Sequence, residues 1–231
     1  KVFSVCDTKK GFWHVKLDEE SSKLTTFNSP FGKFRFLVCP FGLSVAPEEF
    51  QRRLHGALEG LTGIACIADD ILIYGCGNTL EEANKDHDQK LIKLFVRCRE
   101  KGIRLNKEKL KLRCTSVTFM GHRLSADGLG IDETKIDAIE KLKQPDDVRA
   151  VQRLLGMATY LAKFVPQFSE ITTPLRSITE KNSEFLWDND VHGKAFEKLK
   201  SVLRSAPVLQ YFDNKKETTL QCDSSQSGLG A

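Results

Sequence analysis

The chain has 231 residues, more than a usual single domain, so two domains, or one domain and part of another, are expected. Its net charge of +4 is modest, and no stretch approaches the roughly 18 uninterrupted apolar residues of a membrane span, which indicates a soluble protein without a signal peptide. The seven cysteines are scattered and contain no C-x-x-C pair, which argues against a disulfide framework or a zinc knuckle and favours reduced thiols inside a cell.

The first segment, residues 1–7, has the pattern of a strand and ends on Asp7. An extended pattern resumes over residues 11–17, and residues 23–38 predict a hairpin, because two apolar runs flank a segment rich in Asn, Ser, Pro and Gly. An amphipathic helix is then expected over residues 44–61, with apolar side chains on one stripe.

Two adjacent carboxylates, Asp69 and Asp70, stand inside the apolar and β-branched run Ile67–Tyr74. Such a run predicts a buried strand, where ionised carboxylates would cost several kcal/mol each without a compensating cation or donor. The alternative is a tight turn that leaves both side chains in water, since turns favour Asp. A pair of cations would need a third carboxylate from elsewhere, and Asp7 is the candidate. The stretch therefore predicts a metal site.

Thr79 and Glu82 fit a capping box that opens a long amphipathic helix, which stops at Gly102. Strand-like pieces follow over residues 109–113 and 117–124. The first part of the chain is therefore expected to be α+β, an antiparallel sheet with helices packed on it.

From Asp132 the pattern changes to helices, three of which are expected before about residue 205. A loop that contains Pro166 and Pro174 is expected between the second and the third. The tail then begins a new strand with Asp223 at its end.

Basic side chains are concentrated between Lys90 and Arg113. Ten Lys or Arg against two acids give this stretch a charge of +8 and leave −4 on the rest of the chain. The run suggests an anionic partner such as a nucleic-acid backbone, and a solvated helix face is the alternative.

The order of these pieces resembles the reverse transcriptase of the Pol polyprotein of gypsy-class long-terminal-repeat retrotransposons and, more distantly, of retroviruses. The resemblance covers essentially the whole chain. It implies a polymerase palm with partial fingers over residues 1–130, a helical thumb or connection over 131–205, and the truncated start of an RNase H-like domain over 206–231. The residues that carry it are the strand ending on Asp7, Gly11-Phe12, Pro40-Phe41-Gly42, Ala46-Pro47, Phe50-Gln51, Asp69-Asp70, Leu105-Asn106 with Lys109, Phe119-Met120-Gly121-His122, and Asp223.

This resemblance implies that Asp7, Asp69 and Asp70 hold two Mg²⁺ ions for nucleotidyl transfer from a dNTP to a primer 3′-hydroxyl on an RNA or DNA template. Hard cations of this kind prefer oxygen ligands. Lys109 would protonate the departing pyrophosphate, with a solvated lysine as the alternative. Asp223 matches the first RNase H carboxylate, whose partners would lie beyond the last residue, so no working nuclease site is expected.

By the same resemblance, Phe12, which follows Gly11, matches the aromatic residue that packs under the incoming sugar and excludes a 2′-hydroxyl. An ordinary core phenylalanine is the alternative. Pro40, Phe41 and Gly42 match the floor of the nucleotide pocket, where a glycine permits close backbone approach.

Met120, Gly121 and His122 belong to a segment that resembles the hairpin holding the primer end. A lone histidine is more often structural than a ligand, which is the alternative for His122. Gln51 is expected to support its helix rather than to contact substrate. The partners implied are an RNA and DNA primer–template and dNTPs, with no membrane, in cytoplasmic particles or in the nucleus.

The sequence departs from the family at Ile67, where a tyrosine is usual. The basic fingers strand that holds the triphosphate would lie upstream of Lys1, which looks like a cut inside a longer polypeptide, so this stretch alone is expected to polymerise poorly. A second hypothesis is a decayed or host-adopted copy that binds nucleic acid without catalysis. An unrelated two-metal nuclease is disfavoured, because no histidine or further acid lies near Asp69 and Asp70 in the sequence.

Overall fold

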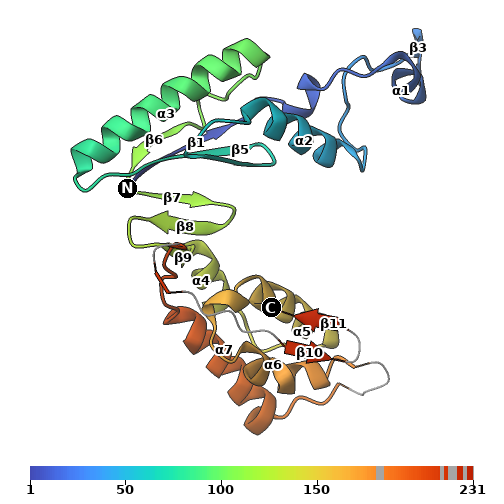
Figure 1. Cartoon of the computed structure of the whole chain (residues 1–231). Helices are drawn as coiled ribbons and strands as arrows, with labels where there is room; N and C mark the ends of the chain where they lie inside the picture. Colours follow the sequence, from blue (N-terminus) through green and yellow to red (C-terminus); the bar gives the residue numbers. More distant parts are fainter. Residues whose placement is uncertain (181–184, 214–215, 218–222, 226–227, 231) are drawn as a thin grey trace.

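The structure, a computed structural model, describes residues 1–180, 185–213, 216–217, 223–225 and 228–230. Figure 1 shows a part of mixed helices and strands followed by a helical part, so the predicted α+β class and the change to helices are both confirmed. Among the described residues, no helix has the length and apolar character needed to cross a membrane.

The first part is organised around a four-stranded antiparallel sheet in the order β4-β5-β1-β6. Its most buried strand, β1, lies inside the sheet between β5 and β6. The elements of this part are β1 (Val2–Asp7), a 3₁₀ helix η1 (Gly11–His14), α1 (Glu19–Leu24), β2 (Phe27–Ser29), β3 (Gly32–Phe34), α2 (Ala46–Leu58), β4 (Ile64–Ile67), β5 (Asp70–Gly75), α3 (Leu80–Lys101) and β6 (Lys111–Cys114).

The two faces of this sheet have different neighbours. Ile71 belongs to a core shared with α2 and α3, whereas Val5 and Leu72 belong to a second core shared with β7 and β8. Because side chains alternate along a strand, Asp7 and Asp70 lie on the same face as Val5 and Leu72, opposite the helices. The alternation therefore puts both carboxylates on the side of the sheet that α2 and α3 leave uncovered.

The second part begins with a three-stranded antiparallel sheet, which Figure 1 shows between the first sheet and the helices. The helices that follow enclose a separate apolar core, in which Val151, Leu175 and Leu199 are fully buried. The elements of this part are β7 (Ser116–Phe119), β8 (His122–Ser125), β9 (Leu129–Ile131), α4 (Glu133–Glu140), α5 (Val148–Tyr160), a 3₁₀ helix η2 (Ala162–Phe164), α6 (Phe168–Ser177), a π-helix η3 (Asn189–Gly193), α7 (Lys194–Arg204), β10 (Asp223–Ser225) and β11 (Gly228–Gly230).

The extended pattern predicted over residues 11–17 is wrong for Gly11–His14, which forms a 3₁₀ helix, whereas Lys16 forms an antiparallel bridge with Val38. The aromatic residues of this helix have the composition of a strand, but the backbone amide of Trp13 donates to the Lys10 carbonyl, and Gly11 is buried against other elements. The short helix α1 was not predicted, although the Asp18 side chain caps it by accepting from the Ser21 amide.

Two further expectations about local structure are wrong. The strand-like piece over residues 117–124 is two strands, β7 and β8, which turn at Met120 and Gly121. The loop expected around Pro174 is the helix α6, which keeps Pro174 in its interior and buries Ile171 and Leu175. A proline in a helix interior costs about 3 kcal/mol, so apolar burial outweighs local propensity here.

Candidate active site

The Asp69–Asp70 pair lies at the tip of the β4–β5 hairpin. Ile67 pairs with Asp70, so Ala68 and Asp69 form a two-residue turn, in which Ala68 has a left-handed backbone with φ of 51°. The buried strand predicted through both carboxylates is therefore wrong. The alternative, a tight turn with both side chains in water, is only partly right, because both carboxylates are partly buried.

The end of β1 fixes the position of Asp69. The Thr8 hydroxyl donates to Asp69 Oδ1 at 2.8 Å, and the Thr8 amide donates to the Asp69 carbonyl at 2.8 Å. Gly11 lies against the same carboxylate, since a Cβ added there would be 2.3 Å from Asp69 Oδ1 and 2.8 Å from a ring carbon of Phe50. The close approach of η1 to the hairpin thus requires a glycine.

Asp7 and Asp70 lie directly opposite each other in the register of β1 and β5. The Lys109 ammonium contacts Asp7 Oδ2 at 2.9 Å. Burial raises the pKa of Asp70, and the neighbouring negative charge of Asp7 raises this pKa further. Asp7, Asp69 and Asp70 therefore concentrate negative charge at one end of the sheet, with the Lys109 ammonium beside them.

The donor set at this point consists of carboxylate oxygens, the ligands that Mg²⁺ prefers. Within the described residues, no group of three or more His, Cys, Asp or Glu is close enough to hold a metal ion, and no ion pair joins Asp69 or Asp70 to a cation. The pKa of Asp70 is raised first by burial and then by the negative charge of Asp7, which the positive charge of Lys109 offsets in part. The chemistry of the three side chains suits a divalent cation, although their present spacing does not form a closed ligand set.

Gln51 reaches the hairpin from α2. Its side-chain amide donates to the Cys66 carbonyl at 3.1 Å, and its amide oxygen accepts from the Ala68 backbone amide at 2.6 Å. The expectation that Gln51 supports its own helix is therefore wrong, because both hydrogen bonds hold the incoming side of the carboxylate-bearing turn, at Cys66 and Ala68. Neither Gln51 nor Thr8 was predicted to contact the hairpin, since these contacts join residues distant in sequence.

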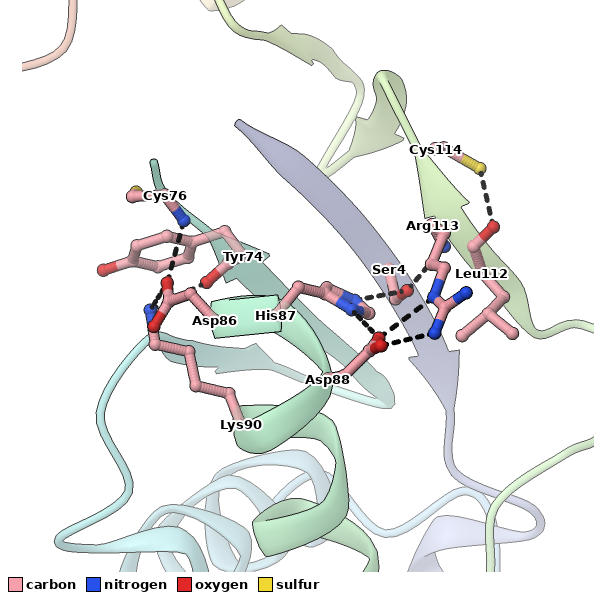
Figure 2. A network of polar contacts seen from close by, with 10 residues as sticks. All are labelled: Ser4, Tyr74, Cys76, Asp86, His87, Asp88, Lys90, Leu112, Arg113 and Cys114. Carbon is pink, nitrogen blue, oxygen red and sulfur yellow. Dashed lines mark hydrogen bonds and ion pairs between the residues drawn. The ribbon is translucent and has the colours of Figure 1, made fainter. Parts of the chain in front are cut away.

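A second polar network, shown in Figure 2, joins β1, α3 and β6. His87 contacts the Ser4 hydroxyl at 2.8 Å through Nε2 and Asp88 at 3.0 Å through Nδ1. Arg113 binds the Asp88 carboxylate with two nitrogens. The connectivity is that of a Ser-His-Asp triad, but Ser4 and His87 are fully buried, so no substrate can reach the hydroxyl.

This network positions β6 instead. Leu112 and Arg113 together oppose Ser4 across the irregular β1–β6 pairing, and Arg113 has a left-handed backbone with φ of 50°. The Arg113 amide, which the irregular pairing frees from the ladder, donates to the Ser4 hydroxyl at 3.0 Å. The network thereby fixes the strand that follows Lys109 beside β1, the strand that carries Asp7. Nothing in the local sequence pattern predicted it.

The residues predicted to form the nucleotide pocket are close together. The Phe12 ring lies 5.3 Å from the Phe41 ring and 5.9 Å from the Phe50 ring, between centroids. Phe12 is partly buried beside the core that the sheet shares with α2 and α3, called the helix-side core below. Phe41 is exposed, and Gly42 has φ of +93°, which a glycine adopts without strain. Pro40 is buried. The contact with Phe50 fits the alternative of an ordinary core phenylalanine, and the role under an incoming sugar stays a prediction.

The predicted primer-holding residues Met120 and Gly121 form the β7–β8 turn, and His122 pairs with Phe119 behind it. His122 is buried, its ring packs on Tyr160, and its Nδ1 has no hydrogen-bond partner among the described residues. Burial lowers the pKa of His122, and the positive charge of Lys163 lowers it further. These contacts favour the structural alternative for His122.

The basic run does not form one free surface. Lys90 pairs with Asp86, Arg97 donates to two backbone carbonyls, and Arg113 pairs with Asp88. With Lys109, which contacts Asp7, four of the ten cations therefore bind groups within the protein. A single solvated face therefore does not describe the run, and an anionic partner for its remaining cations stays a prediction.

The tail strand lies only partly within the described residues. Asp223 begins β10, which pairs with β11. The earlier residues of the predicted strand, 218–222, are outside the described residues. The RNase H role of Asp223 stays a prediction.

Known protein families match two separate parts of the chain. The family model described as reverse transcriptase (RNA-dependent DNA polymerase) matches residues 1–124, and that of an RNase H-like domain found in reverse transcriptase matches residues 187–231. The Pol polyprotein from transposon 412 of Drosophila melanogaster is 33% identical over all of this chain and 18% of its own length. The Tf2-3 transposon polyprotein of Schizosaccharomyces pombe is 28% identical over all of this chain and 17% of its own length.

Solved structures agree with these sequence relatives. A foamy viral protease-reverse transcriptase in complex with dsDNA has a TM-score of 0.83 and 27% identity over 97% of this chain and 46% of its own. Another, in complex with RNA/DNA hybrid, has a TM-score of 0.79 and 28% identity over 93% and 29%. The chain spans about a fifth of the length of the curated relatives. Because the first family model matches more than half of its residues, the chain belongs to the reverse transcriptase family, as its motifs predicted.

Proposed function

We propose that this chain is the palm, thumb and initial RNase H-like segment of an RNA-directed DNA polymerase. In this proposal residues 1–130 are the palm with partial fingers, 131–205 the thumb, and 206–231 the start of the RNase H-like domain. The observation that carries it is the pairing of Asp7 with Asp70 on the helix-free face of the sheet, with Asp69 in the adjoining turn. The nucleic-acid duplexes named with the foamy viral structures support a primer–template as the partner.

Asp7, Asp69 and Asp70 would hold two Mg²⁺ ions. When bound, such ions lower the pKa of the primer 3′-hydroxyl and neutralise the charge of the triphosphate. The acidic donor set and the raised pKa of Asp70 support this assignment, because three crowded carboxylates favour cations.

The surrounding side chains orient these groups. Thr8 and Gln51 hold the turn that carries Asp69 and so orient its carboxylate. Lys109, whose pKa is raised by its hydrogen bond to Asp7, keeps a proton to donate to the leaving pyrophosphate. Phe12 and Phe41 form an apolar surface for the sugar of an incoming dNTP.

A second candidate is a copy that binds nucleic acid without catalysis. The observation that favours it is Ile67, which is 44% exposed where the resembled family usually presents a tyrosine hydroxyl. In either case we place the protein inside the cell, in cytoplasmic particles or in the nucleus. The free state of the six cysteines in the described residues supports that environment.

The test is primer extension on an RNA template with Mg²⁺ and dNTPs, by a longer protein that includes the sequence preceding Lys1 in its gene. Extension is expected, and Asp69→Asn should abolish it. Asp137→Asn, an exposed aspartate of α4, is the matched control and should leave extension unchanged. Extension that survives Asp69→Asn contradicts the catalytic assignment. Salt-dependent binding of primer–template without extension supports the second candidate.

A further inference from the structure

The turn between β7 and β8 has an unusual sequence for its geometry. Met120 and Gly121 both have left-handed backbones, with φ of 49° and 66°. Two-residue hairpin turns of this kind favour Asn-Gly or Asp-Gly, and a left-handed methionine is strained. Strain of this sort persists only where surrounding contacts impose it, so the contacts around the turn are informative.

Those contacts come from the helical part of the chain, by way of Tyr160 at the end of α5. The Tyr160 hydroxyl donates a hydrogen bond to the carbonyl of Met120, the strained residue itself. The Tyr160 ring stacks on the His122 ring with 4.9 Å between centroids and 6° between planes. One side chain therefore contacts both the turn and the strand that leaves it.

Lys135 of α4 completes the arrangement. Its ammonium lies 3.9 Å from the centroid of the Tyr160 ring, which fits a cation–π contact on the face that His122 leaves open. A Cβ added to Gly121 would be 2.4 Å from the Lys135 Nζ and 3.2 Å from the Tyr160 hydroxyl oxygen. The turn thus lies against two thumb side chains, and a side chain at position 121 would displace the Lys135 ammonium and strain the left-handed backbone.

We propose that Tyr160 is a positioning residue, which sets the conformation of the Met120–Gly121 turn and thereby the place of the primer end. This inference rests on the proposed function only in naming the primer end as the group that the turn holds. Met120 is 41% exposed, so its side chain is available to a bound nucleic-acid strand. Its carbonyl accepts the hydrogen bond from the Tyr160 hydroxyl. The hydroxyl couples a thumb helix to the turn, so the two would move together.

The first test uses the 231-residue chain and needs no activity. In Tyr160→Phe the ring and its stacking remain and only the hydroxyl is lost. Amide hydrogen exchange over residues 119–122 is expected to become about tenfold faster, while exchange in the core of α5 stays the same. The matched control is Tyr211→Phe, because the Tyr211 hydroxyl donates to the Ser125 and Gly128 carbonyls at the other turn of the same sheet, at 3.0 and 3.2 Å. That variant should speed exchange at its own turn alone.

The second test measures single-nucleotide incorporation by the longer protein. Misplacement of a reacting end by about 1 Å can cost on the order of 100-fold in rate, so Tyr160→Phe is expected to lower kcat by about 10- to 100-fold. The KM for dNTP and the melting temperature should be nearly unchanged, and Tyr211→Phe should match the wild type.

Unchanged exchange over residues 119–122 in Tyr160→Phe overturns the inference, whatever the activity. A fall in kcat of equal size in Tyr160→Phe and Tyr211→Phe also overturns it, since the effect would then be general to the sheet. If the longer wild-type protein extends no primer, the proposed function fails while the exchange experiment still decides the role of Tyr160.

Discussion

Replacing Gly11 by alanine should disrupt the carboxylate site directly. The new Cβ would be 2.3 Å from Asp69 Oδ1 and 2.8 Å from Phe50, where ordinary contacts begin at 3.4 Å. The carboxylate must therefore retreat by about 1 Å, which breaks its 2.8 Å hydrogen bond from the Thr8 hydroxyl. Phe50 is 4% exposed within the helix-side core and has little room to move.

Overpacking of this kind costs about 1–3 kcal/mol of unfolding free energy. For a chain of this size, the melting temperature should fall by between a few degrees and about 10 °C. If Asp69 is a metal ligand as proposed, its displacement by about 1 Å should reduce nucleotide incorporation on the order of 100-fold. Thermal unfolding and primer extension measure the two effects. Gly56→Ala is the matched control, because Gly56 lies in α2 with nothing within 4 Å of a new Cβ, so helix propensity should stabilise it by up to about 1 kcal/mol. A Gly11→Ala protein as stable and as active as the wild type would refute this reasoning.

Three other substitutions test separate contacts. Asp70→Asn should be more stable than the wild type at pH 7. Burial and the charge of Asp7 raise the pKa of Asp70 in the folded protein. The wild type therefore has its full stability below about pH 4, where Asp70 is protonated, and loses stability as the pH rises through the raised pKa. Urea unfolding should show this advantage vanish near pH 3.5, and an advantage that grows toward acid pH would contradict it. Ala68→Gly should raise the free energy of unfolding by about 1 kcal/mol in the same assay, since Ala68 has φ of 51°; a loss of stability would show that the turn is unstrained. His87→Leu should lower the free energy of unfolding by about 1–3 kcal/mol, because the buried Ser4 hydroxyl loses its 2.8 Å partner; a neutral effect would show that the network of Figure 2 contributes nothing to stability.

Elements whose limits are set locally were predictable from the sequence. The helix α3 begins after Thr79, whose hydroxyl accepts from the Glu82 amide, and ends at Gly102, which has a left-handed φ of 68°. Glu82 accepts from the Asn78 amide, one residue before the expected partner in a capping box. The three carboxylates could be named from the sequence through the family resemblance, and their role as metal ligands stays a prediction.

What the sequence did not reveal depends on contacts between distant segments. The hydrogen bonds of Gln51 to the hairpin and of Thr8 to Asp69 join different elements, and no periodicity encodes them. The helix around Pro174 forms against local propensity because tertiary packing stabilises it. The turn at Met120 lacks the usual turn residues, because Tyr160 supplies the constraint that Asn would otherwise provide.

The central claim is that Asp7, Asp69 and Asp70 together hold divalent cations. Anomalous diffraction from crystals of the longer protein with primer–template, dNTP and Mn²⁺ tests it most directly. We expect two manganese peaks coordinated by these three carboxylates, with both peaks lost or weakened in Asp69→Asn. Manganese bound elsewhere, with nucleotide present and the three carboxylates uncoordinated, would contradict it.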